Sequence, residues 1–138
     1  MHITEQNKKA LVKEIEEVSK MMAGTEIPIQ KLYYFSAIFG IANRILNVQY
    51  DSELGLIHMV LKTAHSAINA ALPTIGPNQS IPDFPPRFFE NLDQTVIDLG
   101  KAITSNNSVY PTLEKISDLT YSTTGNGYYL FLKGALKI

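Results

Sequence analysis

Residues 29–48 are apolar on nearly every side of a helix, and this property constrains the fold more than any other feature of the sequence. Its large apolar residues are Leu32, Tyr33, Tyr34, Phe35, Ile38, Phe39, Ile41, Ile45 and Leu46. A helix that is apolar all round has to be covered all round. We expect a central position in a helical bundle or a subunit interface to provide that cover. Ser36 and Gly40, four residues apart, form a shallow strip where another helix could approach closely.

Charged residues are unevenly distributed along the chain. Residues 1–23 carry eight charged side chains, whereas residues 24–73 carry six. Apolar residues in the first segment recur at spacings of four, three and four, as Leu11, Ile15, Val18 and Met22. This spacing predicts an amphipathic helix with one narrow buried stripe. Gly24 is expected to end this helix, and Pro28 to lie in the first turn of the next one.

A third helix is expected from about Glu53 to Leu72. Asp51 or Ser52 can accept hydrogen bonds from its free N-terminal amides. The stripe that we expect to face the interior contains Leu54, His58, Leu61, His65, Ile68 and Leu72. A loop rich in proline and glycine, residues 74–82, is expected to follow.

The last third of the chain is expected to add two or three helices. The first opens at Pro85 and Pro86 and continues to about Ile103, and a short one runs from Pro111 to about Thr120. A turn is expected at residues 122–127. Residues 128–132 are apolar and aromatic, and their periodicity fits a buried strand or a last helix. We favour a helix, because a lone strand would have no obvious partner.

Together these segments predict an all-α fold. A single helical-bundle domain, residues 1–138, is expected to contain five to six helices, with helices 2 and 3 central. A chain of this length buries roughly 68% of its unfolded surface, enough for a core without disulfides or structural zinc. The strongly apolar run, residues 32–42, is much shorter than the ~20 residues of a membrane span. We therefore expect no membrane insertion.

Composition narrows the range of functions. The chain has 12 Lys and Arg against 13 Asp and Glu and no basic run, which argues against a non-specific nucleic-acid binder. The absence of cysteine excludes thiol catalysis and thiolate metal sites, and it suits a reducing compartment such as the cytoplasm. No motif for nucleophilic catalysis is present. We expect no catalytic residue, no metal and no cofactor, and the balance is against an enzyme.

Two histidines and one arginine are polar side chains on otherwise apolar helices, so each has a structural and a functional interpretation. His58 and His65 share a stripe but lie about 10.5 Å apart along the helix, too far to bind one metal ion easily. In the structural interpretation, both histidines are partly buried and hydrogen-bonded. In the functional interpretation, they take part in acid–base chemistry, sense pH, or bind a metal or cofactor. Arg44 lies within the most apolar helix. Its head group either reaches water or pairs with Asp51 or Glu53, or it binds an anion in a pocket.

Two functional hypotheses follow. The leading one is a small non-catalytic helical interaction protein that self-associates as a homodimer, the commonest soluble oligomer, with a further protein partner left open. An exposed aromatic residue should then mark the interface, with Tyr34 or Phe89 as first candidates. The alternative is a small-molecule-binding or metal-binding helical domain, a class that includes enzymes, whose pocket uses Arg44, His58, His65, Tyr33 and Tyr34.

Overall fold

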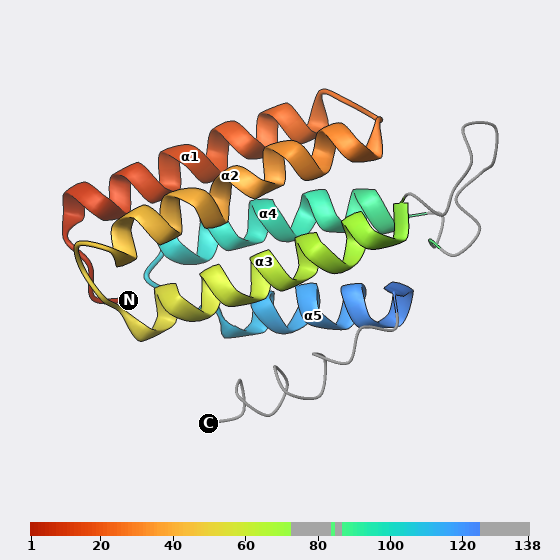
Figure 1. Ribbon diagram of the computed structural model, residues 1–138. Helices are drawn as coiled ribbons and strands as arrows, with labels where there is room; N and C mark the ends of the chain where they lie inside the picture. Colours follow the sequence, from red (N-terminus) through yellow and green to blue (C-terminus); the bar gives the residue numbers. More distant parts are fainter. Residues whose placement is uncertain (73–83, 85–86, 125–138) are drawn as a thin grey trace.

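The computed structural model describes residues 1–72, 84 and 87–124, which form five α-helices (Figure 1). The helices are α1 (Glu5–Ala23), α2 (Pro28–Leu46), α3 (Ser52–Ala71), α4 (Phe88–Thr104) and α5 (Tyr110–Thr124). The expected all-α bundle is confirmed. The predicted loop at residues 74–82 and the predicted last helix at residues 128–132 lie outside the described residues.

The five helices form a closed ring of neighbours. Each packs against two others, in the order α1, α2, α3, α5, α4 and back to α1. The most extensive contact joins α2 and α3, as expected of the central pair. Neighbours run in opposite directions, except that α3 and α5 run in the same direction (Figure 1). None of the described helices combines the length and the apolar character of a membrane span.

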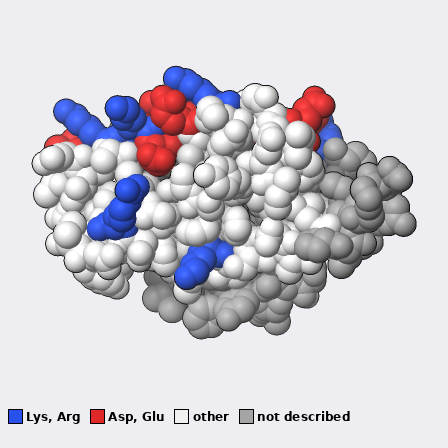
Figure 2. Space-filling view, turned by 45° about the horizontal axis from the view of Figure 1, so that its top comes forward, with Lys and Arg blue, Asp and Glu red and all other residues white. Residues whose placement is uncertain are grey.

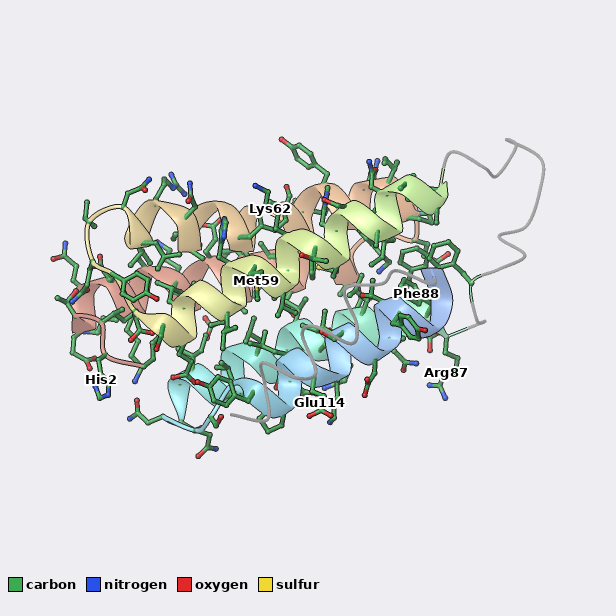
Figure 3. All side chains as sticks on the ribbon, turned by 60° about the horizontal axis from the view of Figure 1, so that its bottom comes forward. His2, Met59, Lys62, Arg87, Phe88 and Glu114 are labelled. Carbon is green, nitrogen blue, oxygen red and sulfur yellow. The ribbon has the colours of Figure 1, made fainter. Side chains whose placement is uncertain are left out.

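One apolar core fills the interior of the ring. The predicted stripe of the first helix is confirmed, because Leu11, Ile15, Val18 and Met22 are all buried. Phe88 of α4 is also buried and packs edge-on against Phe84 and Phe89. Figure 3 shows Phe88 at one end of the bundle and His2 at the other. The core therefore runs the full length of the bundle.

Local capping signals place several helix ends where the sequence predicts them. Gly24 follows the last residue of α1, and Pro28 is the first residue of α2. The buried Asp51 carboxylate caps α3 by accepting the Leu54 N–H at 2.9 Å, and it also accepts the His2 N–H at 2.9 Å. Burial alone would raise the pKa of this carboxyl. The two N–H donors and the nearby charges of the N-terminal amino group and His2 together outweigh burial and lower the pKa below 3.8.

The ends of the last two described helices differ from the expectation. The fourth helix begins at Phe88, and the prolines expected to open it, Pro85 and Pro86, lie outside the described residues. The turn expected from residue 122 is wrong for residues 122–124, which continue α5. Serine and threonine each lower helix propensity by only about 0.7 kcal/mol at most, so they do not by themselves end a packed helix.

Candidate functional site

The predicted inner stripe of α3 is confirmed for Leu54, Leu61 and Ile68, which are buried. Its two histidines lie at the edge of the core and are partly buried, as their structural interpretation predicted. Ile57 and Ala64 are buried, whereas His58 and His65 are half-buried on the side that faces α2. Phe39 of α2 contacts both imidazole rings edge-on, with centroids 6.4 Å from His58 and 5.4 Å from His65. We call these three residues, Phe39, His58 and His65, the histidine seam.

Burial lowers the pKa of both seam histidines below 6.5. The positive charge of Lys62 lowers the pKa of His58 further. For His65, a hydrogen bond to the backbone of Leu32 raises the pKa but does not offset the effect of burial. Burial thus favours the neutral form of both imidazoles at the contact between α2 and α3.

The seam geometry does not suit a shared metal ion. Imidazole nitrogens bind zinc at about 2.0–2.1 Å, and here the ring of Phe39 contacts both histidines. Within the described part of the chain, no three His, Asp or Glu side chains gather closely enough to hold a metal.

The other predicted site residues lie apart from the seam. Arg44 is exposed and forms no ion pair with a described residue. Tyr33 is 75% exposed, and its ring meets the half-buried Tyr34 edge-on at 5.8 Å. Three cavities lined by described residues lie elsewhere, along α1 and beside the N-terminal segment. The structure thus spreads the predicted site residues over the outer sides of α2 and α3.

Of the two structural alternatives for Arg44, the structure agrees with a head group that reaches water, and Asp51 and Glu53 have other partners. The oxygens of Asp51 accept backbone N–H groups. Glu53 Oε2 lies 2.8 Å from the amino group of Met1, and Glu53 Oε1 accepts the Val109 N–H at 3.1 Å. These contacts hold the N-terminal segment and the start of α5 against the start of α3.

A buried ion pair went unrecognised in the sequence. Lys31 is 7% exposed, and its Nζ donates to Asp93 Oδ2 and to the carbonyl oxygen of Met22, both at 2.7 Å. The other Asp93 oxygen, Oδ1, accepts no hydrogen bond from a described residue. The contact joins α1, α2 and α4. The sequence shows only that Lys31 lies within an apolar segment. Its partner Asp93 is 62 residues away, and no sequence pattern connects the two residues.

The outer side of α2 is exposed and nearly uncharged. Ile29 is 55% exposed and Tyr33 75% exposed. At Gly40, no described residue outside the local helix backbone lies within 4 Å of the position a Cβ would take. Arg44 is the one charged residue exposed on this helix. Figure 2 shows charged side chains gathered along one edge of the molecule, next to a broad surface where two basic side chains stand alone.

The neighbouring α3 extends this surface. Gly55, Met59, Lys62 and Ser66 follow one another at spacings of four, three and four, and only Lys62 is charged. Lys62 and Ser66 are exposed, whereas Gly55 and Met59 are half-buried. We call the combined surface the α2–α3 face. It consists of Ile29, Tyr33, Gly40 and Arg44 of α2 and Gly55, Met59, Lys62 and Ser66 of α3.

Comparisons with protein-family models, with curated proteins and with solved structures found no match. The candidate functional features are therefore those of the described residues themselves: the histidine seam and the charge-poor α2–α3 face beside it.

The histidine seam makes stability depend on pH. Because the pKa of His58 and of His65 is lower in the folded chain than the ordinary value of 6.5, the unfolded chain binds these protons more readily. Stability should be highest above pH 6.5 and fall as the pH drops below it. Urea unfolding between about pH 8 and about pH 5 measures this slope.

The double variant His58→Gln/His65→Gln should show a shallower fall in stability over the same pH range. His2→Gln, which changes an exposed histidine outside the seam, is the matched control. Equal slopes for the wild-type protein and the double variant would contradict the assignment of the pH dependence to the seam.

Proposed function

We propose that the protein is a non-catalytic helical interaction module that self-associates as a homodimer through the α2–α3 face. The exposed apolar side of α2 carries this proposal. Interface cores are depleted of charged residues and enriched in aromatic ones, and a contiguous exposed apolar patch commonly marks an interaction site. Tyr33, rather than the half-buried Tyr34 or Phe89, is then the aromatic residue at the interface. With no cysteine, the module suits a reducing compartment such as the cytoplasm.

Gly40 supports a contact between copies. A glycine inside a helix is about 1 kcal/mol less favourable than alanine. Nothing in the described fold lies within 4 Å of the position a Cβ would take at Gly40, so no contact within the chain requires the glycine there. A second helix packed against this point would benefit from the missing side chain, because two backbones could approach closely.

A two-fold axis near the middle of α2 would bring Tyr33 of one copy next to Arg44 of the other. With antiparallel α2 helices centred between residues 38 and 39, Tyr33 of one copy lies opposite Arg44 of the other. A guanidinium over a tyrosine ring is a favourable cation–π contact. The two Arg44 side chains leave their helices about 16 Å apart along the axis, which exceeds the Debye length of about 8 Å at physiological salt.

Sedimentation analysis tests the dimer. The wild-type protein should sediment as a dimer at tens of micromolar, and Tyr33→Asp should sediment as a folded monomer because it places a charge in the apolar contact. Tyr110→Asp, which changes an exposed tyrosine on α5, should stay dimeric and is the matched control. A monomeric wild-type protein, or a Tyr33→Asp variant that remains dimeric, would refute the proposal.

Gly40→Ala separates association from folding. The added methyl group meets open space within one chain, so the free energy of unfolding of the monomer should rise by about 1 kcal/mol. The same methyl group should weaken the dimer by keeping the two helices apart. A Gly40→Ala variant that dimerises as tightly as the wild-type protein would place the contact elsewhere.

A further inference from the structure

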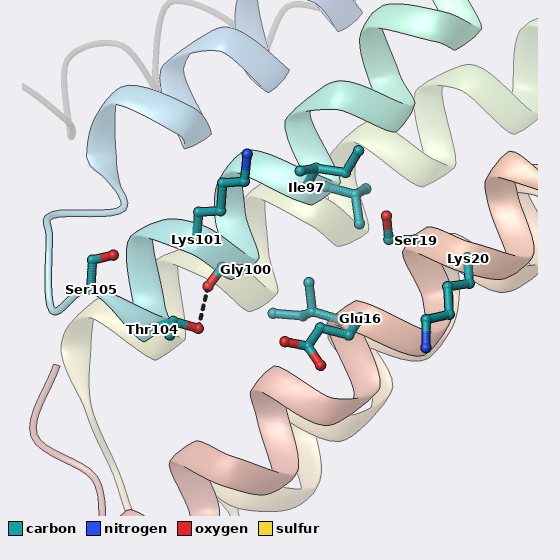
Figure 4. A pocket seen from close by; sticks show the side chains of 10 residues that line it. Glu16, Ser19, Lys20, Ile97, Gly100, Lys101, Thr104 and Ser105 are labelled. Atoms are coloured by element: carbon teal, nitrogen blue, oxygen red, sulfur yellow. Dashed lines mark hydrogen bonds between the residues drawn. The ribbon is translucent and has the colours of Figure 1, made fainter.

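A second surface feature is a groove between α1 and α4, away from the α2–α3 face. Its cavity has a volume of about 410 Å³. The apolar part of its lining comprises Ile15 of α1 and Val96, Ile97 and Gly100 of α4. Figure 4 shows Glu16, Ser19 and Lys20 extending from α1, and Ile97 and Lys101 from α4, around this opening. The groove therefore has an apolar floor and a charged rim.

Small residues on both helices explain why the floor is open. Gly100 is buried, and a Cβ there would lie 3.1 Å from Cγ2 of Ile15, so glycine lets α1 and α4 approach closely. Ser19 and Thr104 also line the cavity, and neither is long enough to cover the floor. The Thr104 hydroxyl donates to the Gly100 carbonyl at 2.9 Å, so it is held against its own helix.

The groove continues towards the start of α1. A second cavity of about 290 Å³ contains Val12 and shares Glu16 and Thr104 with the first. Together the two cavities extend from Glu5 to Lys20, which is about 22 Å along the helix. A groove of this length and openness suits a helix better than a small molecule, because small-molecule pockets enclose 70–90% of their ligand.

The rim of the groove carries a surplus of positive charge. Five lysines line the two cavities, against Glu5 and Glu16: Lys8, Lys9, Lys13, Lys20 and Lys101. The whole chain, by contrast, has a formal net charge of -1. Lys20 also lies 3.8 Å from Glu17, but both side chains are exposed, and such pairs contribute little. The groove therefore favours an occupant with acidic side chains.

We propose that the α1–α4 groove binds an acidic amphipathic helix of a partner protein. The two cavities are centred about seven residues apart along α1, or about 10.5 Å. A helix lying along the groove presents apolar side chains at this distance when they are at positions i and i+7, a common anchor spacing of helices bound in grooves. Acidic residues flanking these anchors would face the lysines of the rim.

The charge of the C-terminal segment and of the α2–α3 face argues against either of them as the occupant. Residues 125–138 contain Lys133 and Lys137 and no acidic residue, so they share the sign of the rim. The α2–α3 face of a second copy carries Arg44 and Lys62 and is also basic. A separate acidic partner is the occupant that complements the groove.

Fluorescence anisotropy with synthetic peptides tests the proposal. The probe is a helix-stabilised peptide of about 15 residues with leucine at positions i, i+3 and i+7 and glutamate on its flanks. Its matched control has lysine in place of glutamate. The acidic peptide should bind at least about tenfold more tightly than the basic one, and its affinity should fall as salt is added.

Charge reversals locate the binding site. Lys20→Glu/Lys101→Glu should weaken binding of the acidic peptide by about tenfold or more, and circular dichroism should show an unchanged fold because both lysines are exposed. Arg87→Glu/Lys115→Glu, which reverses two exposed charges outside both the groove and the α2–α3 face, should leave this affinity unchanged. Equal affinities for the two peptides, no saturable binding, or an undiminished affinity in the groove variant would overturn the proposal.

The same variants test whether the groove binds a membrane surface instead of an acidic helix. If the protein binds vesicles of phosphatidylcholine and phosphatidylserine, but not the acidic peptide, and loses that binding in Lys20→Glu/Lys101→Glu, the groove recognises a lipid surface and the proposal is wrong. If Lys20→Glu/Lys101→Glu still sediments as a dimer, the groove and the dimer interface are separate surfaces. A failure of the groove proposal would then leave the dimer proposal standing.

Discussion

The variant Phe35→Ala is expected to lose about 4 kcal/mol of the free energy of unfolding. Phe35 is 0% exposed and lies in the core on the inner side of α2. Truncation removes the transfer free energy of a phenyl ring and leaves a cavity that the surrounding helices can close only in part. Urea unfolding followed by circular dichroism measures the difference, provided that the protein is diluted until it is monomeric.

Tyr33→Ala is the matched control, two residues away on the same helix. Tyr33 is 75% exposed, so the variant should change the unfolding free energy of the monomer by no more than about 0.5 kcal/mol. At concentrations that favour the dimer, the same variant should reduce the apparent stability, because the wild-type protein is then stabilised by association. Similar losses for Phe35→Ala and Tyr33→Ala in the monomer would contradict the observed division of α2 into a buried and an exposed side.

The variant Asp93→Ala is expected to lose about 3 kcal/mol of the free energy of unfolding. It leaves the ammonium group of Lys31, whose side chain is 8% exposed, without its counter-charge. The Met22 carbonyl still accepts a hydrogen bond from Lys31, but it cannot neutralise the charge. Removing one member of a buried pair costs more than the pair contributes, because the remaining charge stays desolvated. Thermal or urea unfolding measures this loss.

Two further variants isolate the buried charge as the cause. Lys31→Met/Asp93→Leu removes both charges and should recover most of the lost stability, since apolar residues of similar volume can replace a buried pair. Glu90→Ala breaks the exposed pair with Arg87 on the same helix and should cost less than about 1 kcal/mol. A loss in Asp93→Ala no larger than that in Glu90→Ala would contradict this account.

Local signals predicted much of the fold. The buried stripe of α1, its end at Gly24, the start of α2 at Pro28 and the cap of α3 at Asp51 all follow from contacts within a few residues. Helical spacing decides which residues share a side, and capping residues satisfy free backbone groups without help from distant segments. Such features depend on neighbours in sequence, so they can be read from sequence.

The candidate site depends more on packing. In α3, the buried side includes Leu54, Leu61 and Ile68 of the predicted stripe and extends to Ile57 and Ala64, so His58 and His65 lie at its edge against α2. The position of α2 decided where this edge falls. Lys31 and Asp93 lie 62 residues apart, and only the bundle brings them together. The groove between α1 and α4 likewise depends on how two distant helices approach each other at Gly100.

The sequence by itself determined that this chain folds into helices, where most of them begin and end, and that the second helix needs cover on more than one side. Only the tertiary structure decided which side of α2 the chain covers itself, because five helices in a ring bury their inner sides and leave their outer sides to solvent or to a partner. Helical periodicity gives the spacing of residues around one helix. It carries no information about the orientation of that helix relative to its neighbours.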